Sequence, residues 1–70
     1  MLRVSGPRAF AVAARVFEPP MARARAQVDG HVVVRGRAIE AYALTMVAPR
    51  SFTGEDVVEL HVPGSAMLAR

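Results

Sequence analysis

The hydrophobic period of this sequence changes at Glu18-Pro19-Pro20, and that change constrains the fold more than any other feature. Before it, apolar side chains recur at helical spacing, at Phe10, Ala13, Ala14 and Phe17. After it, from Met21 onward, apolar and polar residues alternate, which is typical of a half-exposed strand. Because proline cannot continue the hydrogen-bond ladder of a helix, the sequence predicts an amphipathic helix over 7–17 followed by a sheet.

Four segments are predicted to be strands. The short run Met1–Val4 is the first, and Ser5 after it is placed to cap the helix. The others lie over 21–34, 38–48 and 57–62, and the segment 38–48 is apolar on both faces, as expected of a central strand. In the last strand Val58, Leu60 and Val62 face one way, and Val57, Glu59 and His61 face the other.

Glycines and prolines mark the connections between these strands. Gly36, between two arginines, supplies a hairpin turn, while Asp29-Gly30 marks either a bulge or another tight turn, so the position of the turn stays open. Residues 50–56 are loop-like, with Thr53-Gly54 as a turn signal. Pro63-Gly64-Ser65 predicts a turn into a helix that begins at residues 66–70.

The length of the chain allows one small domain. Its 70 residues bury only roughly 60% of the surface that the unfolded chain exposes, so the core is marginal and a partner surface is expected. There is no cysteine to form a disulfide, and His31 and His61 are too far apart in sequence to suggest a local pair of metal ligands. Oligomerisation, or the rest of a longer protein, is the remaining source of stability.

The charges exclude some classes of function. All nine basic residues are arginines, set singly along the chain against six acids, and this scatter disfavours a direct nucleic-acid site. There is no lysine and no phosphate-binding loop motif, so these residues cannot by themselves form a P-loop GTPase. No apolar stretch approaches the roughly 20 residues of a membrane span, and we expect a cytoplasmic protein with no membrane partner.

Arg3 and Glu59 are the strongest candidates for a site. Each is the only charged residue in a short apolar strand, where a charge is costly unless it meets an opposite charge or a ligand. A ligand site, an ion pair between the two residues, and solvent exposure at a sheet edge all remain open.

Other residues carry weaker signals. Glu55 and Asp56 suggest an acid pair or a magnesium site, but neighbours in a strand point to opposite faces and cannot easily share one ion. His61 shares a strand face with Glu59, which permits either a general-base or a structural role. There are four aromatic residues, Tyr42, Phe10, Phe17 and Phe52. They are too dispersed to form a base-stacking platform, and core packing is expected for most of them.

The run Ser51-Phe52-Thr53-Gly54-Glu55-Asp56-Val57-Val58-Glu59-Leu60-His61 resembles the signature of the N-terminal domain of the MnmE (TrmE) family of tRNA-modification GTPases. The segment Leu2-Arg3-Val4-Ser5-Gly6-Pro7 resembles the opening strand and helix cap of that domain, and Ala48-Pro49-Arg50 resembles the segment that precedes its Ser-Phe-Thr-Gly motif. The resemblance spans nearly the whole chain.

This resemblance implies a function for the candidate residues. It places Arg3 and Glu59 at the positions of the family's folate-contacting arginine and glutamate, with 5-formyl- or 5,10-methylene-tetrahydrofolate as the ligand. A carboxylate such as Glu59 can accept both N–H donors on the 2-amino-4-oxo edge of a pterin. The resemblance also implies a homodimer. In the full-length family it implies GTP, magnesium and potassium as cofactors, and tRNA and an MnmG-like flavoprotein as partners.

The expected fold is therefore α+β: one domain over 1–70, with a small mixed sheet in strand-helix-hairpin-strand-helix order, similar to the family's folate-binding, aminomethyltransferase-like domain. These residues include no counterpart of the family's usual N-terminal extension, its folate-contacting lysine, or its helical and GTPase domains. His61-Val62-Pro63-Gly64-Ser65 replaces the family's glycine- and histidine-rich segment. The alternatives are a ligand-free dimerisation fragment or degenerate relic of that family, and an independent one-carbon-transfer enzyme.

Overall fold

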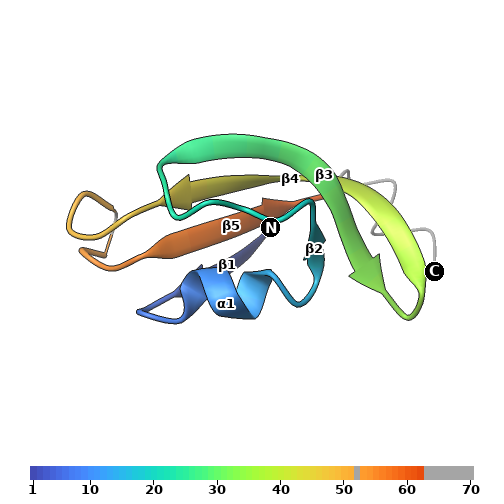
Figure 1. The fold of residues 1–70 in the computed structure, drawn as a ribbon, viewed down its shortest axis with the longest axis horizontal. Coiled ribbons are helices and arrows are strands. Elements are labelled where there is room, and N and C mark those ends of the chain that lie inside the picture. Colours follow the sequence, from blue (N-terminus) through green and yellow to red (C-terminus); the bar gives the residue numbers. More distant parts are fainter. Residues whose placement is uncertain (52, 63–70) are drawn as a thin grey trace.

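The computed structural model describes residues 1–51 and 53–62. In chain order its elements are β1 (Leu2–Ser5), α1 (Ala9–Ala13), β2 (Phe17–Glu18), β3 (Ala26–Val34), β4 (Arg37–Met46) and β5 (Val57–His61). The strands form one five-stranded sheet in the order β1-β5-β4-β3-β2 (Figure 1). Every neighbouring pair is antiparallel, so the α+β class is confirmed but the expectation of a mixed sheet is wrong.

The helix covers one face of the sheet. Figure 1 shows α1 on one side of β1 and β5, and its small residues Ala9 and Ala13 are buried there. They join a core that includes Val58 and Leu60 of β5 and Ala43 of β4. Because side chains alternate along a strand, Glu59 and His61, which lie between and beyond these core residues, face away from the helix. The opposite face of the sheet is therefore the one that carries the candidate residues.

The helix is shorter than predicted. It ends at Ala13, and Phe17 lies instead in β2, opposite Val32 of β3, where its side chain is buried. The amide of Val33 also donates to the carbonyl oxygen of Val16, which draws this segment to the sheet. The prediction that Ser5 caps the helix is wrong: the N-cap is Arg8, and no side chain caps it.

The strand predicted from Met21 begins later, at Ala26. Its first register partner is Thr45, whose hydroxyl accepts a hydrogen bond from the amide of Ala26 and donates one to the carbonyl oxygen of Ala24. The buried side chain of Thr45 therefore takes over backbone hydrogen bonding where the ladder stops. Residues 21–25 thus lie outside the sheet, and the alternation seen there in the sequence is not that of a strand.

Gly36, and not Gly30, turns the chain. Val34 pairs with Arg37, which leaves a two-residue hairpin turn at Arg35 (φ 51°) and Gly36 (φ 77°). Positive φ at both positions is characteristic of a type I′ turn. Gly30 lies within β3, opposite Ala41, in a continuous ladder without a bulge.

Gly30 is required for a different reason, which is the close approach of β2. A Cβ atom added at Gly30 would lie 2.0 Å from the carbonyl oxygen of Glu18 and 2.7 Å from Cδ of Pro19. Such distances are far below van der Waals contact, so only glycine fits without a shift of the neighbouring backbone.

Two strands, β4 and β5, match their predictions closely. The segment predicted over 38–48 forms β4 (Arg37–Met46), which lies between β5 and β3 as a central strand. The segment predicted over 57–62 forms β5 (Val57–His61). Phe52 and the predicted helix over 66–70 lie outside the described residues. Within the described ranges no helix has the length and apolar character needed to cross a membrane.

Candidate functional site

Arg3 and Glu59 are direct partners in the antiparallel ladder between β1 and β5. The Nε and Nη2 groups of Arg3 both donate to Oε2 of Glu59, at 2.9 and 2.7 Å. The Glu59 side chain is only 7% exposed, whereas that of Arg3 is 44% exposed. Of the alternatives that the sequence left open, the ion pair is therefore formed, and it holds a buried carboxylate beneath a half-exposed guanidinium.

His61 contacts the other oxygen of the same carboxylate. It lies two residues along β5 from Glu59, on the same face, and its Nε2 atom is 3.2 Å from Oε1 of Glu59. The three side chains thus form one cluster, with two Arg3 donors at Oε2 and the His61 ring at Oε1.

Tyr42 stacks against this cluster, whereas core packing was expected for most of the aromatic residues. It is the cross-strand partner of His61, and the two rings stack with their centroids 4.7 Å apart and their planes 1° from parallel. Its exposure of 38% excludes a core position. Its position opposite His61, next to the Leu44–Glu59 pair, is a matter of register between β4 and β5. The alternation in the sequence gives the faces of β4 but not that register.

The cluster keeps Glu59 ionised. Hydrogen bonds from Arg3, and then from His61, lower the pKa of the Glu59 carboxyl below its ordinary value, and burial opposes them only in part. At neutral pH Glu59 is therefore a carboxylate, whose oxygens only accept hydrogen bonds. Such a group is suited to a ligand or partner that presents N–H donors or a positive charge.

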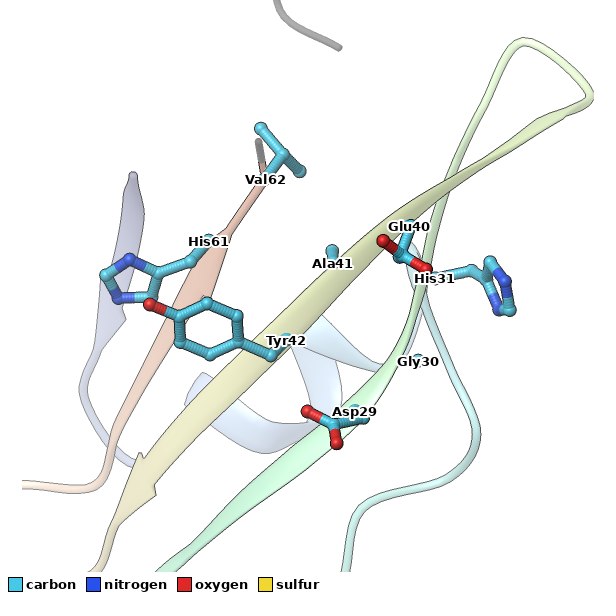
Figure 2. A pocket seen from close by; sticks show the side chains of 8 residues that line it. All are labelled: Asp29, Gly30, His31, Glu40, Ala41, Tyr42, His61 and Val62. Carbon is cyan, nitrogen blue, oxygen red and sulfur yellow. The ribbon is translucent and has the colours of Figure 1, made fainter. Parts of the chain in front are cut away.

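A pocket of about 650 Å³ lies beside this cluster, on the face away from α1. Figure 2 shows its lining: Tyr42 and His61 lie next to each other, with Asp29 on β3 and Glu40 on β4 beyond them. Neither Arg3 nor Glu59 lines the pocket, whereas His61 both lines the pocket and contacts the Glu59 carboxylate.

Asp56 and Glu55 do not act together. The Asp56 carboxylate accepts two hydrogen bonds from the Arg23 guanidinium, at 2.7 and 2.9 Å, and one from the amide of Ala48 at 2.9 Å. These contacts, with Arg23 the largest cause, lower the pKa of Asp56. Glu55 is exposed. Among residues 1–51 and 53–62 no group of histidines and acids is arranged to hold a metal ion.

The Asp56 contacts give this residue a structural role that the sequence did not reveal. They join the segment before β3, the end of β4 and the start of β5, while the amide of Gly6 donates to the Asp56 carbonyl oxygen at 2.9 Å. Arg23 and Asp56 are separated by 33 residues, so neither local spacing nor periodicity could have paired them.

The fold and this cluster define a small α+β module with a buried, ionised carboxylate on the open face of an antiparallel sheet. Residues 1–70 match the family model described as "GTP-binding protein TrmE N-terminus". The chain is 42% identical over 78 aligned residues to the tRNA modification GTPase MnmE of Synechococcus sp. (strain JA-3-3Ab). It is 40% identical over 78 residues to that of Symbiobacterium thermophilum and 44% identical over 77 to that of Roseobacter denitrificans. The chain belongs to the TrmE N-terminus family.

The three alignments cover 100% of this chain but 17% of each relative. The 70 residues therefore correspond to a small part of those proteins, and the activity in the relatives' name is that of much longer chains. No solved structure matches the chain.

Proposed function

We propose that this chain is the tetrahydrofolate-binding and dimerisation module of a GTPase that modifies the wobble uridine of tRNA, with Arg3 and Glu59 as folate contacts. Membership of the TrmE N-terminus family supports the module. The observation that carries the ligand proposal is the buried, ionised Glu59 carboxylate, which contacts His61 in the lining of a pocket.

The chemistry of a pterin suits this carboxylate. The 2-amino-4-oxo edge of a pterin presents two parallel N–H donors, and a carboxylate can accept both. In this chain Oε1 of Glu59 contacts His61, which lines the pocket. Arg3 orients the carboxylate through Oε2 and offers a guanidinium to a carbonyl or carboxylate of the same ligand. The ligand is 5-formyl- or 5,10-methylene-tetrahydrofolate.

Dimerisation is supported by the small core and by apolar surface at the start of β1. Met1 and Leu2 are 62% and 57% exposed. Burial of these two side chains against a second copy of the chain would stabilise a dimer. The GTP, magnesium, potassium, tRNA and MnmG-like flavoprotein belong to the proposed full-length assembly in the cytoplasm. We assign no contact with them to these residues.

A second function is favoured by one observation. Arg3 donates twice to Oε2 of Glu59 and His61 contacts Oε1, so these side chains can compensate the charge of the carboxylate without a ligand. A dimerisation module that binds no folate would use the same cluster only to stabilise the sheet.

Calorimetric titration with 5-formyltetrahydrofolate, together with sedimentation of the 70-residue chain, separates these functions. The folate module predicts a dimer whose saturable binding is lost in Glu59→Ala and kept in Glu55→Ala, which removes an exposed acid outside the cluster. A folded dimer without binding would favour the ligand-free module. Binding that Glu59→Ala leaves unchanged would refute the assignment of Glu59.

A further inference from the structure

His61 stands between the pocket and the Glu59 carboxylate. Its ring lines the pocket, while its Nε2 atom lies 3.2 Å from Oε1 of Glu59, which does not line the pocket. The His61 side chain is 25% exposed and that of Glu59 is 7% exposed. A donor that approaches Glu59 from this pocket therefore meets His61 first, and the two compete for the same oxygen.

Tyr42 holds the His61 ring in this position. The two residues are direct cross-strand partners, and their stacked rings are parallel to within 1° (Figure 2). Rotation of the His61 ring about its Cβ–Cγ bond would tilt it out of the parallel stack and lose the contact with Tyr42. The stack therefore keeps the ring edge aimed at Glu59, and Tyr42 is a positioning residue for His61.

The strength of the His61 contact depends on its proton. A protonated imidazole donates from both ring nitrogens and carries a positive charge, whereas a neutral imidazole donates from one nitrogen only. The contact with Oε1 is therefore charge-assisted in the protonated form and weaker in the neutral form. Histidine side chains change between these forms within about pH 5 to 8.

We propose that His61 is a proton-controlled gate of Glu59: when protonated it holds Oε1, and when neutral it releases that oxygen to a ligand donor from the pocket. This inference rests on the proposed folate function and adds its regulation. Ligand binding at Glu59 then competes with protonation of His61, so affinity rises as the pH rises.

Charged groups lie near His61 on several strands of the sheet. Glu59 on β5 contacts it directly, and Arg3 on β1 is already engaged with that same carboxylate. Asp29 is the cross-strand partner of Tyr42, and Glu40 precedes Tyr42 by two residues on the same face. Other titratable groups to be controlled are His31, which lines the same pocket, and the amino group of Met1, which precedes β1.

The test is calorimetric titration of the full chain with 5-formyltetrahydrofolate at pH 5.5 and pH 8, at constant ionic strength. We expect binding to be about tenfold weaker at pH 5.5, because the two pH values lie on either side of the range in which histidine side chains commonly change charge. His61→Ala and His61→Gln should bring this ratio close to one. His31→Gln removes the other histidine of the pocket and should keep the tenfold ratio.

A second measurement needs no ligand. The nitrogen-15 resonance of His61 Nε2 should shift in Glu59→Gln, because the contact with Oε1 is altered, while the ring resonances of His31 stay in place. Tyr42→Leu should broaden the His61 signal, and Tyr42→Phe should restore it because the stacked ring returns.

The outcomes distinguish failure of the His61 gate from failure of the proposed folate binding. Wild-type binding of equal affinity at both pH values, or His61 variants that keep the tenfold ratio, would overturn the gate and leave the folate function standing. An unshifted Nε2 resonance in Glu59→Gln would also overturn it. No binding in the wild type or in either His61 variant at either pH would overturn the folate function, and the gate with it.

Discussion

Arg3 and Glu59, 56 positions apart in the sequence, meet as cross-strand partners, and both Arg3 donors converge on one carboxylate oxygen, Oε2. This asymmetry leaves Oε1 to His61. A guanidinium that bonded to both oxygens would occupy the whole carboxylate. Here Arg3 fixes the orientation of the carboxylate through Oε2 alone, and Oε1 faces His61. The ion pair and the ligand site that the sequence suggested are thus compatible in geometry.

The first prediction concerns the stability of this pair. Arg3→Met removes both donors at Oε2 and leaves the buried Glu59 with His61 alone, so it should lower the free energy of unfolding by about 1–2 kcal/mol. The double variant Arg3→Met/Glu59→Gln should recover part of this loss, because the uncompensated charge is gone. Urea unfolding at pH 7 measures both, and a double variant less stable than Arg3→Met would contradict this account.

The second prediction concerns acid. The Arg23 guanidinium lowers the pKa of Asp56 from 3.8, and Arg3 with His61 lowers that of Glu59 from 4.5. A carboxyl whose pKa is lower in the folded state stabilises the fold fully above its ordinary value. That contribution is lost as the pH falls through the lowered value.

We therefore expect the urea midpoint to fall as the pH drops below about 4.5, and Asp56→Asn to flatten part of this fall. Glu55→Gln removes an equal charge from an exposed neighbour and serves as the control. A midpoint that rises toward acid pH, or an Asp56→Asn profile parallel to that of the wild type, would show that the Arg23 contact does not stabilise the fold.

The sequence predicted the faces of the sheet well. Alternation alone placed Glu59 and His61 on the face opposite Val58 and Leu60, because the side-chain period of a strand is two whatever its neighbours are. Alternation also allowed Arg3 to lie on the same sheet face as Glu59. The two residues stood out because each was the only charged residue in a short apolar strand. Local pattern is sufficient for such assignments.

Register and long-range contacts were not accessible in this way. The stack of Tyr42 on His61 depends on which residues of β4 and β5 lie opposite each other, and the contact of Arg23 with Asp56 joins segments with no common pattern. Phe17 fitted the helical period, but pairing with β3 gave its side chain a buried place in the sheet. Tertiary context decided between two locally acceptable structures.

The third prediction separates two glycines. Gly30→Ala should lower the free energy of unfolding by about 1–3 kcal/mol, because its Cβ would overlap the backbone of Glu18. Gly36→Ala meets no atom within 4 Å but must keep φ near 77°, and should cost about 1 kcal/mol. Gly36→Asn, which tolerates this φ, should cost less. A fully tolerated Gly30→Ala would argue against the close approach of β2 to β3.

The last prediction tests how the sheet ends. The hydroxyl of Thr45, a residue only 2% exposed, accepts from the amide of Ala26 and donates to the carbonyl oxygen of Ala24. Thr45→Val keeps the shape but leaves these groups without that partner, so it should lower the free energy of unfolding by about 1–3 kcal/mol.

Thr45→Ser keeps the hydroxyl and loses one methyl group, and should cost only about 1 kcal/mol, the value of a small apolar deletion. Hydrogen exchange adds a local measurement, since the Ala26 amide should lose protection in Thr45→Val and keep it in Thr45→Ser. If the two variants were equally stable and equally protected, packing and not the hydroxyl would hold residues 24–26 against β4. Thr45 binds the carbonyl oxygen of Ala24, the residue next to Arg23. In that case another interaction would have to hold Arg23 in contact with Asp56.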